Sequence, residues 1–409
     1  MIQAGVYLHI PFCRSRCSYC DFATGMFESA SAETYVRAIC LEIERWCEVE
    51  QPALVDTIYF GGGTPSLLSA SQIESILKAV RDRFEIAGDA EITLEINPGD
   101  GGPGAASKRN DNERNDNNQS ARLDAALVQR DSRNEFFHHL RRLGINRASF
   151  GAQTFDDREL KQLGRTHDAA DVEHTFQQLR HAGFQNVNFD LIAGLPGQTM
   201  SGWKRNLGRA LQLRPEHLSL YLLDVHEGTP LAAQIKSGMR PKPDEDLAAE
   251  MYATMIETVC AAGYEHYEIS NFCLPGFESR HNTKYWAGDA YYGFGNSAHS
   301  YDGARRRWAN ERDAAKYVER IEKNESPISE RTKLSVEDAR SESIFLGLRL
   351  MQGLDLANYQ QRFGRDLRVE YDGELDRLIE AGLIEIYSER LRLTSRGALL
   401  SNEVFTALA

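Results

Sequence analysis

The first half of the chain alternates short runs of β-branched and apolar residues with amphipathic stretches, and this alternation limits the fold more than any other feature. The runs are "GVYLHI" from Gly5, "DTIYF" from Asp56, "EITLEI" from Glu91, "RASFG" from Arg147, "NVNFDLI" from Asn186 and "HLSLYLL" from His217. Strands that alternate with helices predict an α/β fold with a parallel sheet, either open or curled into a barrel. In such folds the chemistry lies where the strands end, because the βα loops converge there.

Two segments depart from this rhythm. Residues 100–132 are crowded with Gly, Asn, Asp and Ser and lack aromatic residues, so we expect a surface insertion in the barrel, with a lid over the site as the functional alternative. From residue 331 onward, helical patterns and a hairpin predict a winged-helix-like α+β domain. The predicted organisation is a barrel at 1–230, a connecting region at 231–330 and a C-terminal domain at 331–409.

Charge and composition exclude several function classes. A formal charge of -13 argues against a protein that coats nucleic acid, since phosphate binding needs clustered Lys and Arg. Residues 331–409 hold 11 Lys and Arg against 13 Asp and Glu, so we expect a docking module rather than a DNA-binding winged helix. The N-terminal stretch lacks a signal-peptide pattern, and no window reaches roughly 18 consecutive apolar residues, so we expect a cytoplasmic protein.

A cysteine motif follows the first strand. The stretch "CRSRCSYC" places Cys13, Cys17 and Cys20 at CxxxCxxC spacing. Three thiolates can hold three corners of a 4Fe-4S cube and leave one iron open to an outside ligand. A structural zinc site is the alternative, with His9 as a fourth ligand, although His9 lies within the strand. The other four cysteines are scattered, which is typical of free thiols.

The second strand ends in a glycine run, "FGGGTPS", from Phe60 to Ser66. Successive glycines let the backbone turn tightly and approach a ligand closely. A plain tight turn is the alternative. Because this strand end lies beside the cysteine loop, the run is a candidate wall of the same site.

Five motifs in order carry a resemblance: "YLHIPFCRSRCSYCDF", "GGGTPS", "LEINPG", "RASFGAQTFDDRELKQLGRTH" and "NFDLIAGLPGQT". Together they resemble the radical S-adenosylmethionine (SAM) superfamily, in the branch that contains oxygen-independent coproporphyrinogen III oxidase and the haem chaperone HemW. The resemblance runs from Tyr7 to the C-terminal "LTSRGALLSNEVF", apart from the insertion. It implies a partial (β/α)6 radical SAM barrel that binds a 4Fe-4S cluster and SAM.

The resemblance also implies roles for single residues. Cys13, Cys17 and Cys20 would ligate the cluster, and SAM would complete the fourth iron. The SAM pocket would be lined by Tyr7, Tyr19, Gly62, Gly63, Thr64, Glu95, Gln153, Arg165 and Asp190. A carboxylate in an apolar strand needs a partner, which the amine or ribose hydroxyls of a ligand can provide. A structural pair with a neighbouring Arg is the alternative for each carboxylate.

Two features separate the oxidase from the chaperone. The oxidase pattern is CxxxCxxCxC, whereas Asp21 and Phe22 follow Cys20 here, as in HemW-like sequences. The stretch "SRHNTKYW", from Ser279 to Trp286, matches the HNxxYW motif associated with haem binding in that family.

The HNxxYW motif therefore implies that His281 ligates haem iron, with Tyr285 and Trp286 as flat faces for the porphyrin. The secondary candidates are His266 and His299, expected to be loop or pocket residues, and Cys273 as a thiolate.

On this interpretation the chain is a haem chaperone that binds a 4Fe-4S cluster, SAM and haem. Its expected partners are haem and haem-accepting proteins of the respiratory chain, and no nucleic acid. A homodimer and peripheral membrane association during transfer are further expectations. The alternative function is oxygen-independent coproporphyrinogen III oxidase, which decarboxylates propionates in porphyrin metabolism. A radical SAM enzyme for another substrate is a third.

Overall fold

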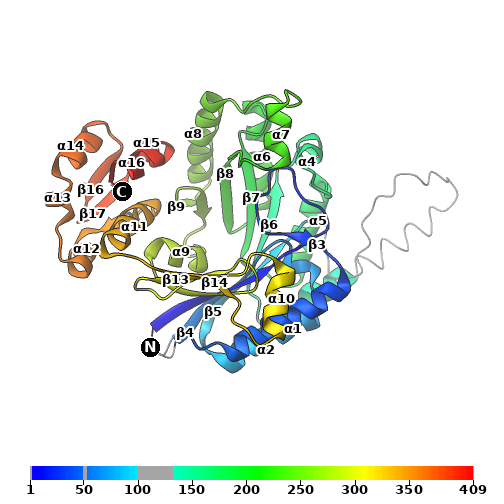
Figure 1. The fold of residues 1–409 in the computed structure, drawn as a ribbon. Helices are drawn as coiled ribbons and strands as arrows, with labels where there is room; N and C mark the ends of the chain where they lie inside the picture. The colour runs from blue at the N-terminus through cyan, green and yellow to red at the C-terminus, as the bar shows by residue number, and fades with distance from the viewer. Residues whose placement is uncertain (1, 49–52, 100–131, 409) are drawn as a thin grey trace.

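The six predicted strands are present and lie side by side in sequence order (Figure 1). They are β1 (Ile2–Ile10), β4 (Ala53–Gly62), β5 (Glu85–Ile96), β6 (Arg147–Gln153), β7 (Val187–Ala193) and β8 (His217–Leu222). All neighbouring pairs among them are parallel, which confirms the predicted α/β class. The computed structural model describes residues 2–48, 53–99 and 132–408, so the predicted insertion lies outside the described residues apart from Ser132.

The sheet continues beyond these strands at both edges, to 12 strands. A parallel strand and three antiparallel ones extend the β1 side: β11 (Ala290–Phe294), β12 (His299–Tyr301), β13 (Arg306–Asn310) and β14 (Ile328–Lys333). Two antiparallel strands extend the β8 side: β10 (Asn271–Cys273) and β9 (Glu265–Glu268). The outermost strands β14 and β9 do not pair with each other, so the barrel is partial.

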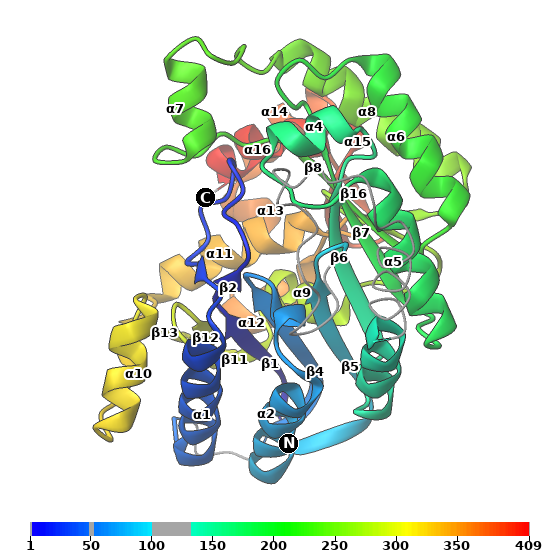
Figure 2. The same cartoon turned by 90° about the vertical axis from the view of Figure 1, so that its right-hand side faces the viewer.

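Helices cover the outer face of this sheet, and Figure 2 shows α1, α2 and α5 in front of the strands. The helices of this half are α1 (Ser29–Arg45), α2 (Ala70–Arg83), α4 (Asp157–Gln162), α5 (Ala169–His181), α6 (Met200–Leu213), α7 (Pro230–Lys236) and α8 (Glu245–Ala261), with a 3-10 turn η1 (Pro65–Leu67). Helix α2 begins at a capping box between Ser69 and Gln72, and its buried Ile73, Ile76 and Leu77 share one face.

The inner face of the sheet is polar, because side chains alternate along each strand. In β1, Val6 and Leu8 are fully buried in the core, while Tyr7 lies on the opposite face and stacks on Tyr59 of β4. A short helix, α9 (Arg280–Ala287), lies against this inner face, on the side of the sheet away from α1 and α2 (Figure 1). Tyr7 and Tyr59 on this face stack on His281 of α9.

The C-terminal part has the predicted order of helices, hairpin and closing helix. Its elements are α11 (Val336–Arg349), β15 (Leu354–Asp355), α12 (Leu356–Phe363), α13 (Leu367–Glu370), α14 (Asp372–Glu380), β16 (Ile384–Tyr387), β17 (Arg390–Leu393), α15 (Ser395–Leu399) and α16 (Ser401–Leu408). The three strands form a separate sheet. Helix α10 (Ala314–Glu322) lies apart from this unit and packs on α1.

Across the parts of the chain that the structure describes, no helix has both the length and the apolar character needed to cross a membrane.

Candidate functional site

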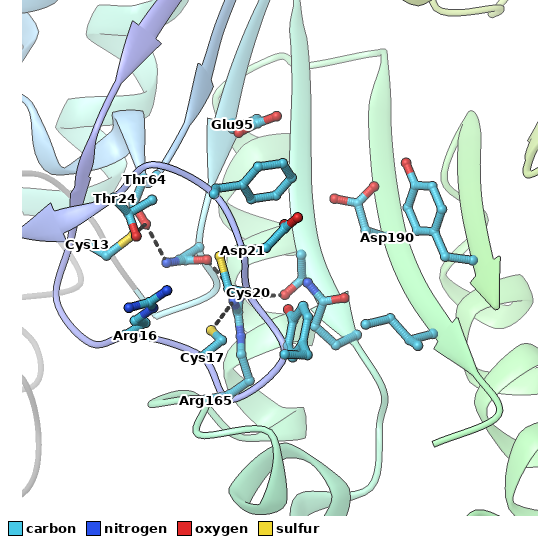
Figure 3. Close-up of a pocket in the computed structure, with 18 of the residues that line it drawn as sticks. Cys13, Arg16, Cys17, Cys20, Asp21, Thr24, Thr64, Glu95, Arg165 and Asp190 are labelled. Atoms are coloured by element: carbon cyan, nitrogen blue, oxygen red, sulfur yellow. Dashed lines mark hydrogen bonds between the residues drawn. The ribbon is translucent and has the colours of Figure 1, made fainter. Parts of the chain in front are cut away.

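The three motif cysteines lie on one loop between β1 and α1. Cys13 ends the short strand β2 (Phe12–Cys13), which pairs with β3 (Gly25–Met26). The Ser18 amide donates to the Leu163 carbonyl at 2.9 Å, which anchors the loop from outside, and the Phe27 amide donates to the Cys13 carbonyl at 3.0 Å within the loop. None of the seven cysteines forms a disulfide, and the three in the motif line one cavity of about 400 Å³. Figure 3 shows them around the near wall of this cavity.

This arrangement fits an iron-sulfur cluster better than a single metal ion. Among the described residues, no three His, Cys, Asp or Glu side chains converge closely enough to hold one ion. In a 4Fe-4S cube each thiolate binds a different iron, so convergence on one point is not needed. Burial raises the pKa of Cys13 to about 11 and also raises the pKa of Cys20. The thiols are therefore expected to lose their protons when metal binds.

The glycine run at the end of β4 turns the backbone under the cysteine loop. Gly62 has a φ of 111°, and Gly63 lies so close to the preceding loop that a Cβ there would be 2.6 Å from the Phe12 carbonyl oxygen. The Gly63 amide donates to the Ile10 carbonyl at 2.8 Å. The glycines therefore allow a close contact with the protein's own backbone. This contact brings Gly62, Gly63 and Thr64 to the cavity wall.

Two carboxylates face the cysteines from across the cavity (Figure 3). Glu95, on β5, accepts hydrogen bonds from the Tyr59 hydroxyl at 2.8 Å and from the Gly62 amide at 3.1 Å. Asp190, on β7, accepts one from the Asn188 side-chain amide at 2.8 Å. Burial raises the pKa of Glu95 to about 7 and also raises the pKa of Asp190. Both carboxylates line the cavity, and the nearby charge of Arg147 opposes the rise in the pKa of each.

An arginine connects the cysteine loop to the strands. The Arg165 guanidinium donates to the Asn97 side-chain oxygen at 2.7 Å and to the Gly151 carbonyl at 2.8 Å, and it lies 3.4 Å from the Cys17 sulfur. Gln153 ends β6 with a φ of 64° and also lines the cavity.

One member of the predicted SAM pocket lies outside this cavity. Tyr19 lines it, but Tyr7 lies deeper, where its hydroxyl is 3.1 Å from Nδ1 of His9 and its ring stacks on Tyr59 and His281. His9 is buried, and its other ring nitrogen is 3.2 Å from the Ala23 carbonyl. His9 is therefore engaged by protein groups rather than poised as a fourth ligand.

The HNxxYW residues lie on α9, away from the cysteines. His281 is 1% exposed, with Nδ1 2.9 Å from the Thr57 hydroxyl and Nε2 2.9 Å from the Tyr285 hydroxyl. Burial lowers the pKa of His281 to about 3, so the ring is neutral. Trp286 packs under the Arg349 guanidinium of α11 at 4.2 Å. With both ring nitrogens occupied, His281 can reach haem iron only after α9 moves.

The secondary candidates for haem ligation lie away from the cavity of the cysteines. His266 stacks on Phe272 at 4.4 Å and its Nε2 lies 3.2 Å from the Ile269 carbonyl. His299 is an exposed residue of β12, and Cys273 is buried in β10. None of the three lines the cavity of the cysteines.

The cavity also includes residues that the sequence analysis did not single out as site residues. Asn97 follows β5, and His226 follows β8. Both come directly after a parallel strand, so the rule that sites form at strand ends was the signal that could have found them.

Comparison with known proteins gives two family matches. Residues 7–208 match the radical SAM superfamily, and residues 334–400 match the HemN C-terminal domain. The first match spans the cysteine loop and the strands β1 to β7, and the second spans most of the C-terminal unit.

Individual relatives match over nearly the whole chain. The heme chaperone HemW of Bacillus subtilis (strain 168) is 34% identical over 98% of this chain and 98% of its own. The heme chaperone HemW of Mycobacterium tuberculosis (strain H37Rv) is 34% identical over 99% of this chain and 94% of its own. Among solved structures, coproporphyrinogen III oxidase (HemN) from Escherichia coli superposes with a TM-score of 0.79 at 24% identity, over 100% of this chain and 90% of that one. This last likeness concerns the fold alone.

Proposed function

Because the chain belongs to the radical SAM superfamily, and within it to the family of HemW haem chaperones, we propose that it binds haem and passes it to haem-dependent proteins of the respiratory chain. The observation that carries the proposal is the match to relatives of that name over nearly the whole of both chains. The chaperone acts on a scaffold that holds a 4Fe-4S cluster and SAM, and haem is its cargo.

The cavity supplies the groups that this scaffold needs. We assign the cluster to Cys13, Cys17 and Cys20, whose three thiols share one wall. SAM is assigned to the facing residues, namely Tyr19, Gly62, Gly63, Thr64, Glu95, Gln153, Arg165 and Asp190. A ligand amine can donate to Glu95, and ribose hydroxyls can donate to Asp190. When bound, a reduced cluster supplies one electron to SAM, and the protein positions both and excludes water.

The oxidase is the second candidate. The fold of the Escherichia coli oxidase supports it, since that structure superposes over the whole chain. Against it stands Phe22, at the position of the fourth cysteine in the oxidase pattern. Phe22 is 63% exposed, so this position carries an apolar ring at the cavity mouth in place of a thiol.

We expect the protein to work in the cytoplasm, and a homodimer and peripheral membrane association during transfer stay predictions. Haem ligation by His281, with Tyr285 and Trp286 as porphyrin faces, also stays a prediction, and it requires that α9 leave its present position.

One anaerobic experiment separates the two candidates. The full chain is reconstituted with iron and sulfide and titrated with haemin while the Soret difference band is followed. In parallel it is given SAM, a reductant and coproporphyrinogen III. We expect one haem per chain and no protoporphyrinogen IX. Formation of protoporphyrinogen IX without stoichiometric haem binding would contradict the chaperone function.

A further inference from the structure

A guanidinium is buried on the inner face of the sheet, below the cluster cavity. Arg147 is the first residue of β6 and is 1% exposed. Ala148 and Phe150 of the same strand belong to the hydrophobic core, so Arg147 and Ser149 share the opposite, inner face. Ser149 lines the cavity, whereas Arg147 does not. The guanidinium therefore lies inside the barrel and is shielded from solvent.

The strand register places Arg147 between the cavity and α9. Arg147 pairs with Thr93 of β5. On the same face of β5, Glu95 lines the cavity on one side of Thr93, and Glu91 accepts backbone amides of α9 on the other. Arg147 therefore lies on the face of the sheet that α9 covers (Figure 1).

The charge of Arg147 has no counterion in contact with it. Among the residues that the structure describes, its guanidinium forms no ion pair or hydrogen bond, and its Nε is buried without a partner. The Thr93 hydroxyl is also fully buried without a partner. Glu95 and Asp190 respond to the charge of Arg147, but their hydrogen bonds go to other groups. Because a buried charge is normally paired, these donors indicate a place for an anion.

The other ionisable groups that respond to Arg147 are neutral. Burial lowers the pKa of His217 and lowers that of His281 to about 3, and the charge of Arg147 lowers both further. Burial raises the pKa of Tyr267, whose hydroxyl lies 2.7 Å from Nε2 of His217. Burial also raises the pKa of the Cys273 thiol to about 12. None of these groups carries a negative charge near neutral pH.

The proposed cargo carries the missing anion. Haem has propionate carboxylates at one edge, and a guanidinium binds a carboxylate through two parallel hydrogen bonds. Tyr7, Tyr59 and Tyr285 lie around His281 at ring-centroid distances of 6.4, 5.2 and 5.2 Å. Aromatic rings of this kind favour contact with a flat conjugated ligand. The face under the HNxxYW helix thus combines aromatic rings with an uncompensated cation.

We propose that Arg147 and the Thr93 hydroxyl bind a propionate of haem, once α9 has moved to admit haem between itself and the inner face of the sheet. This inference rests on the proposed function and deepens it, since it names the group that recognises the acidic edge of the cargo. His281 supplies the iron ligand in this arrangement. The propionate then provides the counterion that Arg147 lacks.

The test compares haemin with haemin dimethyl ester, in which the propionates are neutral. Each is titrated anaerobically into the full chain with its cluster reconstituted, while the Soret band is followed. We expect wild type to bind haemin about tenfold more tightly than the ester, and Arg147→Met to bind the two within about twofold of each other. Arg147→Lys keeps the charge and should keep a preference of about threefold or more. Arg331→Met, which removes an exposed arginine paired with Glu48, is the matched control and should keep the preference of wild type.

The fold is measured separately in the same variants. Because the Arg147 guanidinium is buried without a counterion, Arg147→Met should unfold at a temperature equal to or above that of wild type and should keep the iron of the cluster. An arginine that only supported the fold would give the reverse, a lower unfolding temperature and an unchanged preference for haemin.

The outcomes separate this inference from the proposed function. The inference is overturned if wild type binds haemin and the ester equally, if Arg147→Met keeps the preference or unfolds at a lower temperature, or if Arg147→Lys shows no more preference than Arg147→Met. Haem binding by wild type in any of these cases leaves the proposed function intact. A wild type that binds neither haemin nor the ester would overturn both.

Discussion

Single residues of the cysteine loop have no substitutes nearby. Among the described residues, no other His, Cys, Asp or Glu groups with the motif cysteines as a metal site, so a lost thiolate cannot be replaced. We expect Cys17→Ser to lower the iron and acid-labile sulfide of the reconstituted protein to less than half of wild type. Cys260→Ser, at an exposed cysteine of α8, is the matched control and should keep full iron. Equal iron in the two variants would refute the cluster assignment.

A buried carboxylate on α1 gives a prediction for pH. Glu42 accepts hydrogen bonds from Tyr317 at 2.6 Å, Asn310 at 2.6 Å and the Gly295 amide at 2.8 Å, which ties α1 to α10 and to the loop after β11. Burial nevertheless raises the pKa of Glu42 to about 7. The folded state therefore holds the Glu42 proton more tightly than the unfolded state does.

Protonation of Glu42 therefore contributes to the free energy of unfolding. This contribution is fully present below the ordinary carboxyl pKa and is lost as the pH rises through about 7. Glu42→Gln cannot titrate, so its free energy of unfolding should fall less between pH 5 and 8 than that of wild type, by roughly 1–3 kcal/mol. At pH 5 the variant should stay within about 1 kcal/mol of wild type, because the protonated Glu42 carboxyl is neutral and carries a donor, as the amide does. Urea unfolding at several pH values measures both. Parallel pH profiles for wild type and variant would show that Glu42 keeps an ordinary pKa.

Residue positions were predictable where the strand pattern determines them. Glu95 and Asp190 are polar residues in apolar strands, and a parallel sheet brings such strand ends together. Depth within the barrel is not encoded in the same pattern. The alternation of side chains along β1 predicts the face of the sheet on which Tyr7 lies. How deep Tyr7 lies in the barrel depends on how the strands are staggered, and in the structure it lies below the cavity.

At the scale of elements, α9 is held by charges rather than by an apolar stripe. Lys284 lies 2.9 Å from Asp56 of β4, and both side chains are at most 10% exposed. Glu91 of β5 accepts the backbone amides of Arg280 and His281 at 3.2 and 3.1 Å, at the helix N-terminus. These contacts fix the helix that carries the HNxxYW motif against the inner face of the sheet.

Breaking the buried pair should loosen this helix. We expect Lys284→Met to cost up to about 3–5 kcal/mol, because it leaves the buried Asp56 carboxylate with only the more distant Arg280 guanidinium, at 3.9 Å. Hydrogen exchange should rise in residues 280–287 more than in α2. Arg331→Met removes the exposed pair with Glu48 and should cost less than about 1 kcal/mol. Similar losses in the two variants would mean that the Lys284 pair does not hold α9.

The same helix shows where prediction from sequence stops. The parallel strands could be predicted because each is a short apolar run buried on at least one face. The HNxxYW stretch has eight helical residues and only two buried ones, His281 and Lys284, so its sequence has no apolar period. Its position depends on Asp56 and Glu91, more than 180 residues away in sequence, and no local pattern contains that information.

At the scale of the whole molecule, the cluster cavity and the helix that carries the HNxxYW motif lie along the same inner face of the sheet. The ring of His281 stacks on Tyr59, whose hydroxyl donates to Glu95 in the cavity wall. The cavity mouth is formed by loops that follow β1, β4, β5, β6, β7 and β8. The α9 site faces the C-terminal unit, where Arg349 pairs with Glu268 at 2.7 Å and stacks on Trp286. Because no residue of α9 lines the cavity, haem bound at α9 would leave the cavity mouth uncovered.

This arrangement predicts how haem affects SAM exchange. If haem binds at α9, bound SAM can still leave through the open mouth, so haem loading should change the rate of SAM dissociation by less than twofold. Because coupling between binding equilibria is reciprocal, any gain in SAM affinity must appear as an equal gain in haem affinity. Release of radiolabelled SAM into excess unlabelled SAM, with and without haemin, measures the rate. Release of SAM that is at least tenfold slower after haem loading would instead place haem across the mouth and contradict the α9 site.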